Sequence, residues 1–262
     1  MKQRLIGMAL AAAFAMPLAT GIAHAKATPE EIARLGKDLT CIGAEKAGNA
    51  DGSIPEWSGK WLGAPPHVDF KGTGNHPIDP YAGEKPLFEI TAANLAQYAD
   101  KLTEGQKALF AKYPQTYRML IYPTHRDFRY PDAVCASTLR NAQEAELRDD
   151  GMGVHSFTNG VMFPFPKSGL ELLWNLTVPY RAYTEQLISD NAYVIGDGSI
   201  NWGRTKSRNM GPSHKPGMIE PTDDLVASYY LNETLLPERD RGEVNTGVEF
   251  YNYKTKPRQS WR

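Results

Sequence analysis

The chain has 262 residues, of which 41% are hydrophobic and 23% are charged, and its formal net charge at pH 7 is −1. This near-neutral balance argues against nucleic acid as the main partner, because binding to phosphates needs a concentrated basic surface. The length fits one large β-rich domain or two small ones.

Residues 1–25 are predicted to be a secretory signal peptide. Lys2 and Arg4 precede an apolar stretch that is too short to cross a bilayer, and Ala23 and Ala25 put small side chains at the cleavage-determining positions. An uncleaved membrane anchor is the alternative. The first cysteine is Cys41 and does not follow the cleavage point, which argues against a lipoprotein. We therefore expect residues 26–262 to work in a bacterial periplasm.

Cys41 and Cys135 are the two cysteines of the chain. In an oxidising compartment a lone pair of cysteines often forms a disulfide, which we expect here. Two buried free thiols are the alternative.

The N-terminal half predicts short helices joined by irregular segments. Thr28, Pro29 and Glu31 form a capping-box pattern that opens a helix over residues 28–37. Residues 41–90 are rich in glycine and proline, but aromatic residues such as Trp57 and Trp61 are spaced through them. Because disordered segments are usually poor in aromatics, we expect an ordered strap that is anchored to the body of the protein.

Four further helices are expected over residues 91–99, 103–113, 131–147 and 168–176, with a short extended piece at 117–122. Thr103 and Gln106 form a capping box, and so do Ser168 and Glu171.

After Pro179 the chain becomes rich in β-branched and aromatic residues. Strands are expected over residues 180–188, 193–195, 200–206, 225–233 and 248–253, separated by turns at 189–191, 196–198 and 241–242. Such closely spaced strands indicate an antiparallel meander. The sequence thus predicts a single α+β domain over residues 26–262, with helices and the strap covering one face of a curved antiparallel sheet. Arg204, Lys206 and Arg208 alternate with polar residues, as on the solvated face of a hairpin.

Few patterns point to chemistry. None of the histidines after residue 25 lies three or four residues from another, neither cysteine has a close Cys or His partner, and no Gly-x-Ser-x-Gly elbow is present. Asn49, Asp51 and Gly52 match the middle of a calcium loop, but Ala47 and Ser58 stand where carboxylates are wanted. We therefore predict a turn for this segment and not a calcium site. No catalytic residue, metal site or cofactor is predicted.

Residues 163–175 read Phe-Pro-Phe-Pro-Lys-Ser-Gly-Leu-Glu-Leu-Leu-Trp-Asn. Two prolines hold the chain extended while two phenylalanines project from it, ahead of the capped helix. The segment fits either core packing beneath the helix or an apolar lining for a hydrophobic ligand.

This segment and residues 51–57, which read Asp-Gly-Ser-Ile-Pro-Glu-Trp, resemble the bacterial family of domain of unknown function 1329 (DUF1329), often described as outer-membrane lipoprotein-sorting-like. The resemblance implies the fold of the lipoprotein carriers LolA and LolB, an unclosed antiparallel β-barrel wrapped on helices. Members of the family usually continue beyond the point where this chain stops, so the resemblance also implies a C-terminally truncated product. An open sheet edge there would favour self-association.

The leading hypothesis is a non-enzymatic periplasmic carrier of a lipid or other acyl-bearing molecule, which is held on an apolar concave side of the sheet. Its candidate ligand-binding residues are Met162, Phe163, Phe165, Trp174 and Tyr183. The resemblance suggests a membrane exporter and an outer-membrane protein as partners. The alternatives are an assembly module that binds proteins by strand addition, and a periplasmic hydrolase.

Overall fold

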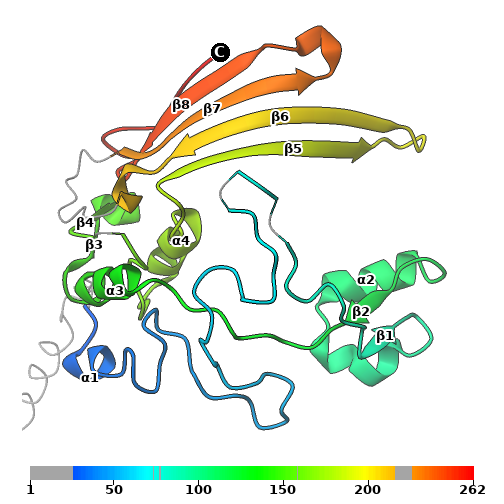
Figure 1. The fold of residues 1–262 in the computed structure, drawn as a ribbon, viewed down its shortest axis with the longest axis horizontal. Helices are drawn as coiled ribbons and strands as arrows, with labels where there is room; N and C mark the ends of the chain where they lie inside the picture. The colour runs from blue at the N-terminus through cyan, green and yellow to red at the C-terminus, as the bar shows by residue number, and fades with distance from the viewer. Residues whose placement is uncertain (1–25, 73, 77, 158, 216–225) are drawn as a thin grey trace, which may run out of the picture.

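The computed structural model describes residues 26–72, 74–76, 78–157, 159–215 and 226–262. The predicted signal peptide, residues 1–25, lies outside this range. The fold is α+β (Figure 1).

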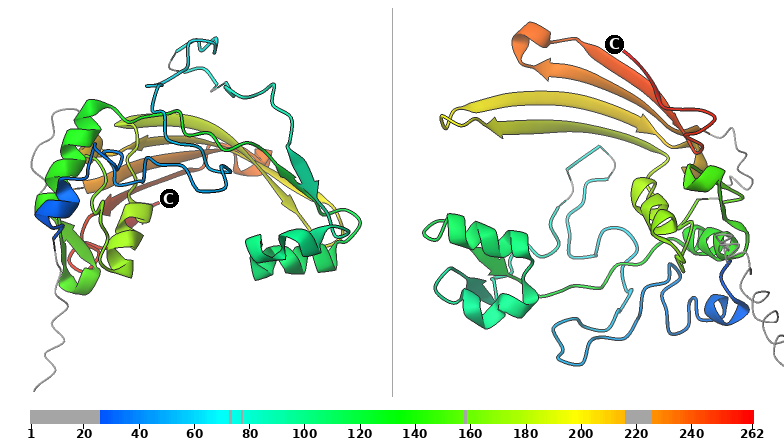
Figure 2. Two further views of the ribbon diagram at one scale, coloured as in Figure 1. Left: turned by 90° about the horizontal axis from the view of Figure 1, so that it is seen from below. Right: turned by 180° about the vertical axis from the view of Figure 1, so that it is seen from behind.

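Its largest part is a five-stranded antiparallel sheet in which each strand pairs with the next one along the chain. The strands are β5 (Thr184–Val194), β6 (Ile200–Met210), β7 (Val226–Leu236), β8 (Val244–Phe250) and β9 (Gln259–Trp261). The sheet is curved and does not close on itself, so β5 and β9 form its two edges (Figures 1 and 2). The predicted antiparallel meander is confirmed. The finer likeness to the barrel of the lipoprotein carriers stays a prediction.

One predicted turn is wrong. Ser189, Asp190 and Asn191 lie inside β5, opposite Thr205, Arg204 and Gly203 of β6. Cross-strand pairing with a long partner strand outweighs the local turn preference of the Ser-Asp-Asn sequence. The turn at residues 196–198 is present, and there Asp197 Oδ1 accepts a hydrogen bond from the backbone N–H of Ser199 at 2.8 Å.

The N-terminal half contains two small hairpins and several short helices. Strands β1 (Phe88–Ile90) and β2 (Met119–Ile121) form a lobe with the 3₁₀-helix η1 (Leu95–Lys101) and helix α2 (Glu104–Lys112). Strands β3 (Glu146–Arg148) and β4 (Gly153–His155) flank η2 (Asp149–Gly151). The remaining helices are α1 (Pro29–Ile32), α3 (Asp132–Glu144), α4 (Gly169–Thr177), η3 (Pro212–His214) and η4 (Glu238–Asp240).

Several helices differ from the predicted ones. The helix expected over residues 28–37 is a single turn, although its Thr28 capping box forms. The helix expected over residues 131–147 ends at Glu144, because the next residues pair with β4 instead. The helix expected over residues 91–99 is a 3₁₀-helix that begins at Leu95.

The main hydrophobic core lies where α4 and the β3–β4 hairpin meet the end of β8. Trp174 of α4 donates its indole N–H to the carbonyl oxygen of Gly151 at 2.9 Å and stacks on Tyr253. Tyr251 is fully buried and packs edge-to-face against Phe157. The buried members of this core are Ala145, Leu147, Val154, Phe157, Met162, Phe163, Trp174, Ala227 and Tyr251.

A disulfide joins Cys41, at the start of the strap, to Cys135 in α3, with the two Cα atoms 5.1 Å apart. Helices α1, α3 and α4 lie at one end of the sheet, whereas α2 and the β1–β2 lobe lie toward the other end, and the outer half of the β5–β6 hairpin extends away from α3 and α4 (Figures 1 and 2). In the described ranges, no helix has the length and hydrophobicity needed to cross a bilayer.

Candidate functional site

The two faces of the sheet differ in chemistry. Side chains alternate between the faces along each strand, and residues paired across strands share a face. On one face, exposed apolar side chains follow the register from β5 to β9: 59% of Ile188, 73% of Val194, 50% of Ile200, 57% of Trp202 and 56% of Trp261 remain exposed. We call this the apolar face. Val194, Ile200 and Trp202 are neighbours in the register, and such a cluster of exposed apolar side chains indicates an interaction site.

The apolar face also bears charges along its middle. Arg204 and Asp190 are cross-strand partners joined by two hydrogen bonds of 2.5 and 2.7 Å. This contact holds the pKa of the Asp190 carboxyl below its usual value. Lys206 and Arg208 follow on β6, and Glu233 of β7 lies opposite Lys206.

The opposite, polar face contains an open hollow of about 520 Å³. Hydroxyl and amide side chains from β5 to β8 line it, and Glu243 and Arg262 form an ion pair at its rim. The lining residues are Ser189, Asn191, Thr205, Ser207, Asn232, Thr234, Glu243, Asn245 and Arg262. The side chains that line this hollow are thus polar, and the expected apolar hollow that holds a ligand stays a prediction.

Helix α4 adds a second apolar surface. Its residues Glu171 and Trp174 are buried, whereas Leu172, Leu173 and Leu176 are 50%, 54% and 70% exposed. Residues four apart share a helix face, so Leu172 and Leu176 form a stripe with Leu173 beside it.

The structure brings three of the five predicted ligand-binding residues into the core, where Met162, Phe163 and Trp174 are buried. Asn175 fixes Phe163 there by accepting its N–H at 3.0 Å and donating to its carbonyl oxygen at 2.7 Å. The role of these residues in ligand binding stays a prediction.

Phe165 and Tyr183, the other two, are half-buried. Met162, Phe163 and Phe165 border a cavity of about 20 Å³. Such a volume has room for about one water molecule. The apolar face was not among the predicted sites, although Ile200 and Trp202, two residues apart in the sequence, share one face of a strand.

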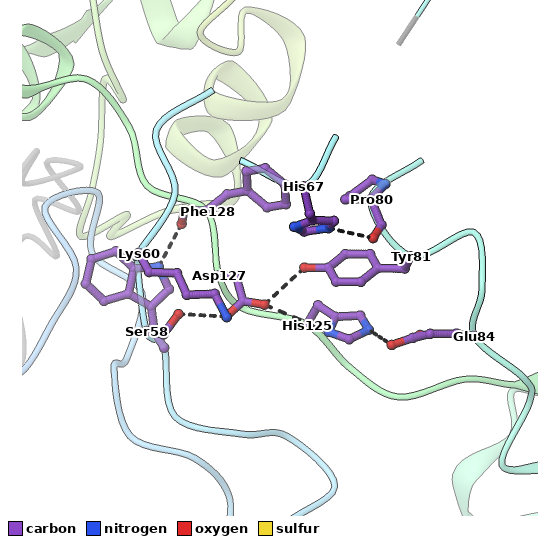
Figure 3. A network of polar contacts seen from close by, with 10 residues as sticks. Ser58, Lys60, His67, Pro80, Tyr81, Glu84, His125, Asp127 and Phe128 are labelled. Carbon is purple, nitrogen blue, oxygen red and sulfur yellow. Dashed lines mark hydrogen bonds and ion pairs between the residues drawn. The ribbon is translucent and has the colours of Figure 1, made fainter. Parts of the chain in front are cut away.

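A polar network fastens the strap to the segment that precedes α3 (Figure 3). The Asp127 carboxylate accepts hydrogen bonds from Ser58 at 2.7 Å and from the Tyr81 hydroxyl at 3.1 Å, and it lies 3.2 Å from the Lys60 ammonium. His125 stacks on Tyr81 with ring centroids 3.6 Å apart.

The electrostatics follow from these contacts. The hydrogen bond from Ser58 is the main reason why the pKa of Asp127 lies below its usual value. Burial and the hydrogen bond to Asp127 raise the pKa of Tyr81 to about 12, so both groups keep their charge states near neutral pH. His125 Nε2 lies 2.6 Å from Glu84, whereas the Ser58 hydroxyl contacts Asp127. The contacts of Asp127 with Ser58, Tyr81 and Lys60 anchor the strap to this segment.

The calcium-like segment is a turn. Asp51 Oδ1 accepts hydrogen bonds from the backbone N–H and the hydroxyl of Ser53, and Asn49 Oδ1 accepts one from the N–H of Ile54. Gly52 lies in the left-handed region at φ +73°. Throughout the part of the chain that the structure describes, no group of three or more His, Cys, Asp or Glu side chains is arranged to hold a metal ion.

The chain is similar to the "Uncharacterized protein PA3922" of Pseudomonas aeruginosa, with 38% identity over 245 residues, which cover 90% of this chain and 51% of that protein. The chain thus spans about half the length of this relative. No solved structure matches it. The sequence profile of the proteins of unknown function DUF1329 matches residues 89–262. The chain belongs to the DUF1329 family, as its two sequence motifs predict.

Proposed function

We propose that this protein is a non-enzymatic periplasmic carrier that holds a hydrophobic, acyl-bearing molecule on the apolar face of its sheet. The observation that supports this most is the exposure of Val194, Ile200 and Trp202, which lie together at the end of the β5–β6 hairpin. Covering an apolar side chain of this size contributes about 1.5–3 kcal/mol, so a few of them give a useful affinity.

The ligand gains as well. Each methylene that leaves water contributes about 0.8 kcal/mol, so an acyl chain has a large gross tendency to leave solvent for such a surface. The exposed leucines of α4 offer further apolar area. The curved, unclosed sheet is compatible with the barrel of the lipoprotein carriers LolA and LolB, and this likeness is part of the proposal.

The test compares two substitutions at the same hairpin end. Trp202 lies on the apolar face and is 57% exposed, and Tyr193 lies on the polar face and is 65% exposed. We expect Trp202→Ser to weaken the binding of a fluorescent fatty acid about tenfold or more, because it removes a large apolar contact. Tyr193→Ser is the matched control and should leave binding unchanged.

Lipid extraction and mass spectrometry of residues 26–262, purified from a periplasm, test independently whether the protein binds a lipid. Co-purifying acyl-bearing compounds support the proposal. A protein without bound lipid, together with equal effects of the two substitutions, contradicts it.

A second candidate function is an assembly module, and the outer edge of β5 favours it. This strand has 11 residues and pairs with β6 on one side only among the described strands. A long edge strand without proline or lysine can accept a partner strand. Replacing Thr184 by proline should then abolish an interaction with a partner protein while fatty-acid binding persists.

A further inference from the structure

The middle of the apolar face carries a row of basic residues. Arg204, Lys206 and Arg208 occupy every second position of β6, so all three side chains share the face of Ile188 and Trp202. Strand β6 has β5 on one side and β7 on the other, which places this row inside the sheet rather than at an edge.

The three positive charges are not equally neutralised. Asp190 neutralises Arg204 through its two hydrogen bonds. Arg208 contacts the uncharged side-chain amide of Gln186, with Nε and Oε1 3.3 Å apart. Glu233 lies opposite Lys206 in the register and offsets one of the two remaining charges. This part of the face therefore has a net positive charge of about one.

The basic row has apolar neighbours on both sides. Ile188 is the cross-strand partner of Lys206 on β5, and Leu231 is that of Arg208 on β7. Lys206 is half-buried, and a lysine in such a place can cover apolar surface with its methylene groups while its ammonium group stays in water. A ligand that covers these apolar side chains also brings its polar end beside a positive charge.

The distance along the hairpin fits one acyl chain. Lys206 lies six positions along β6 from Ile200 at the hairpin end. At the rise per residue of a β-strand this is a distance of about 20 Å. An acyl chain in one leaflet of a bilayer spans about 15 Å. A headgroup over Lys206 and Arg208 would thus leave its chain crossing the neutralised Arg204–Asp190 pair and ending over Trp202 and Ile200.

We infer that the ligand is an anionic amphiphile with a single extended acyl chain. Its headgroup lies over Lys206 and Arg208, and its chain follows the β5–β6 hairpin towards Val194 and Ile200. This inference rests on the proposed carrier function and adds the charge and the orientation of the ligand.

The experiment compares palmitate with hexadecanol, which has the same chain length without the negative charge, by displacement of a neutral fluorescent lipid at pH 8. The wild-type chain should bind palmitate about two- to fivefold more tightly than hexadecanol, since contacts between exposed charges contribute modestly. Raising the salt concentration to 1 M should reduce this preference, because salt screens such contacts.

Substitutions locate the headgroup. Lys206→Gln and Arg208→Gln should remove the preference for palmitate while hexadecanol binding stays unchanged. Arg239→Gln is the matched control. Arg239 is an exposed arginine on the connection between β7 and β8, and its replacement by glutamine changes the net charge by the same amount. Circular dichroism confirms that each variant folds.

The outcomes separate the two proposals. Equal affinity of the wild-type chain for palmitate and hexadecanol overturns the anionic ligand and leaves the carrier function standing. A preference that survives both substitutions overturns the placement over Lys206 and Arg208. Failure to bind either molecule contradicts the carrier function, and the further inference falls with it.

Discussion

Asp127 connects the strap to the rest of the protein through single contacts with Ser58, Tyr81 and Lys60. Asp127→Asn keeps the shape of the side chain but removes the charge that these donors stabilise. We expect the free energy of unfolding to fall by about 1 kcal/mol at pH 7, because hydrogen bonds to a charged group contribute about that much when partly exposed. Thermal unfolding monitored by circular dichroism measures the change.

The pH dependence of this effect has a defined sign. The pKa of Asp127 is lowered in the folded state, so the unfolded chain binds the proton more tightly. The stabilisation is complete above the ordinary carboxyl pKa of about 4 and is lost as the pH falls through the lower, folded-state value. The difference between wild type and Asp127→Asn should therefore shrink below about pH 4. A difference that stays constant down to pH 2 contradicts this role.

Gly43 shows how closely the strap contacts the segment at residues 163–175. It has φ +93°, and a β-carbon there would lie 2.6 Å from the carbonyl oxygen of Pro164. Gly43→Ala should lower the free energy of unfolding by about 2–4 kcal/mol, because a backbone clash adds to the strain of the left-handed region.

Gly36 is the matched control, with φ +80° and open space around its added β-carbon. Gly36→Ala should cost only the backbone strain, about 1–2 kcal/mol. Equal melting temperatures of the two variants would show that the strap does not depend on its contact with Pro164.

Among the helices, the capping residues Thr28, Thr103 and Ser168 correctly predicted where α1, α2 and α4 begin. The side chain of Thr103 accepts a hydrogen bond from the backbone of Gln106, and the Gln106 side chain accepts one from the backbone of Thr103, as the sequence pattern predicts. Thr103→Ala should lower the free energy of unfolding by about 1 kcal/mol, since it leaves one helix N–H without its partner. Chemical denaturation measures this, and Thr103→Ser should retain most of the stability. A Thr103→Ala variant as stable as the wild type would contradict the cap.

Strand limits were harder to predict than helix starts. The Ser189-Asp190-Asn191 sequence favours a turn locally, yet it forms the middle of β5 because β6 supplies partners along its whole length. The β3–β4 hairpin escaped prediction for a similar reason, since its three-residue strands have too few residues for a clear alternation. Pairing between distant residues decides such cases, and a local pattern contains no information about it.

The candidate site was predictable only in part. Phe163 and Trp174 were recognised as a dense apolar pair, and their burial shows that the same pattern serves core packing. The apolar face required the register between β5 and β6, because only that pairing places Val194 beside Ile200 and Ala192 beside Trp202. Hydrophobic residues at alternate positions identify a strand face but do not tell whether another element covers it.

For the molecule as a whole, a disulfide to α3 and hydrogen bonds from the segment before α3 both hold the strap. The disulfide spans 94 residues between Cys41 and Cys135, and Arg126 donates hydrogen bonds to the carbonyl oxygens of Ala47 and Pro55. The loop closed by the disulfide therefore contains the whole strap and the β1–β2 lobe. Constraining a loop of this length lowers the entropy of the unfolded chain by an amount equivalent to about 4–5 kcal/mol.

Reduction should accordingly destabilise the whole N-terminal half. We expect dithiothreitol to lower the melting temperature by about 10 °C or more and to open the strap to proteolysis near residues 60–80. The β5–β6 hairpin keeps its protection because its pairing does not involve the disulfide. Peptide mapping by mass spectrometry after brief digestion locates the cuts. The double variant Cys41→Ser, Cys135→Ser should behave like the reduced protein and should not respond to dithiothreitol. Identical melting of the oxidised and reduced wild-type chains would mean that the noncovalent contacts of Arg126 and Asp127 are sufficient to hold the strap.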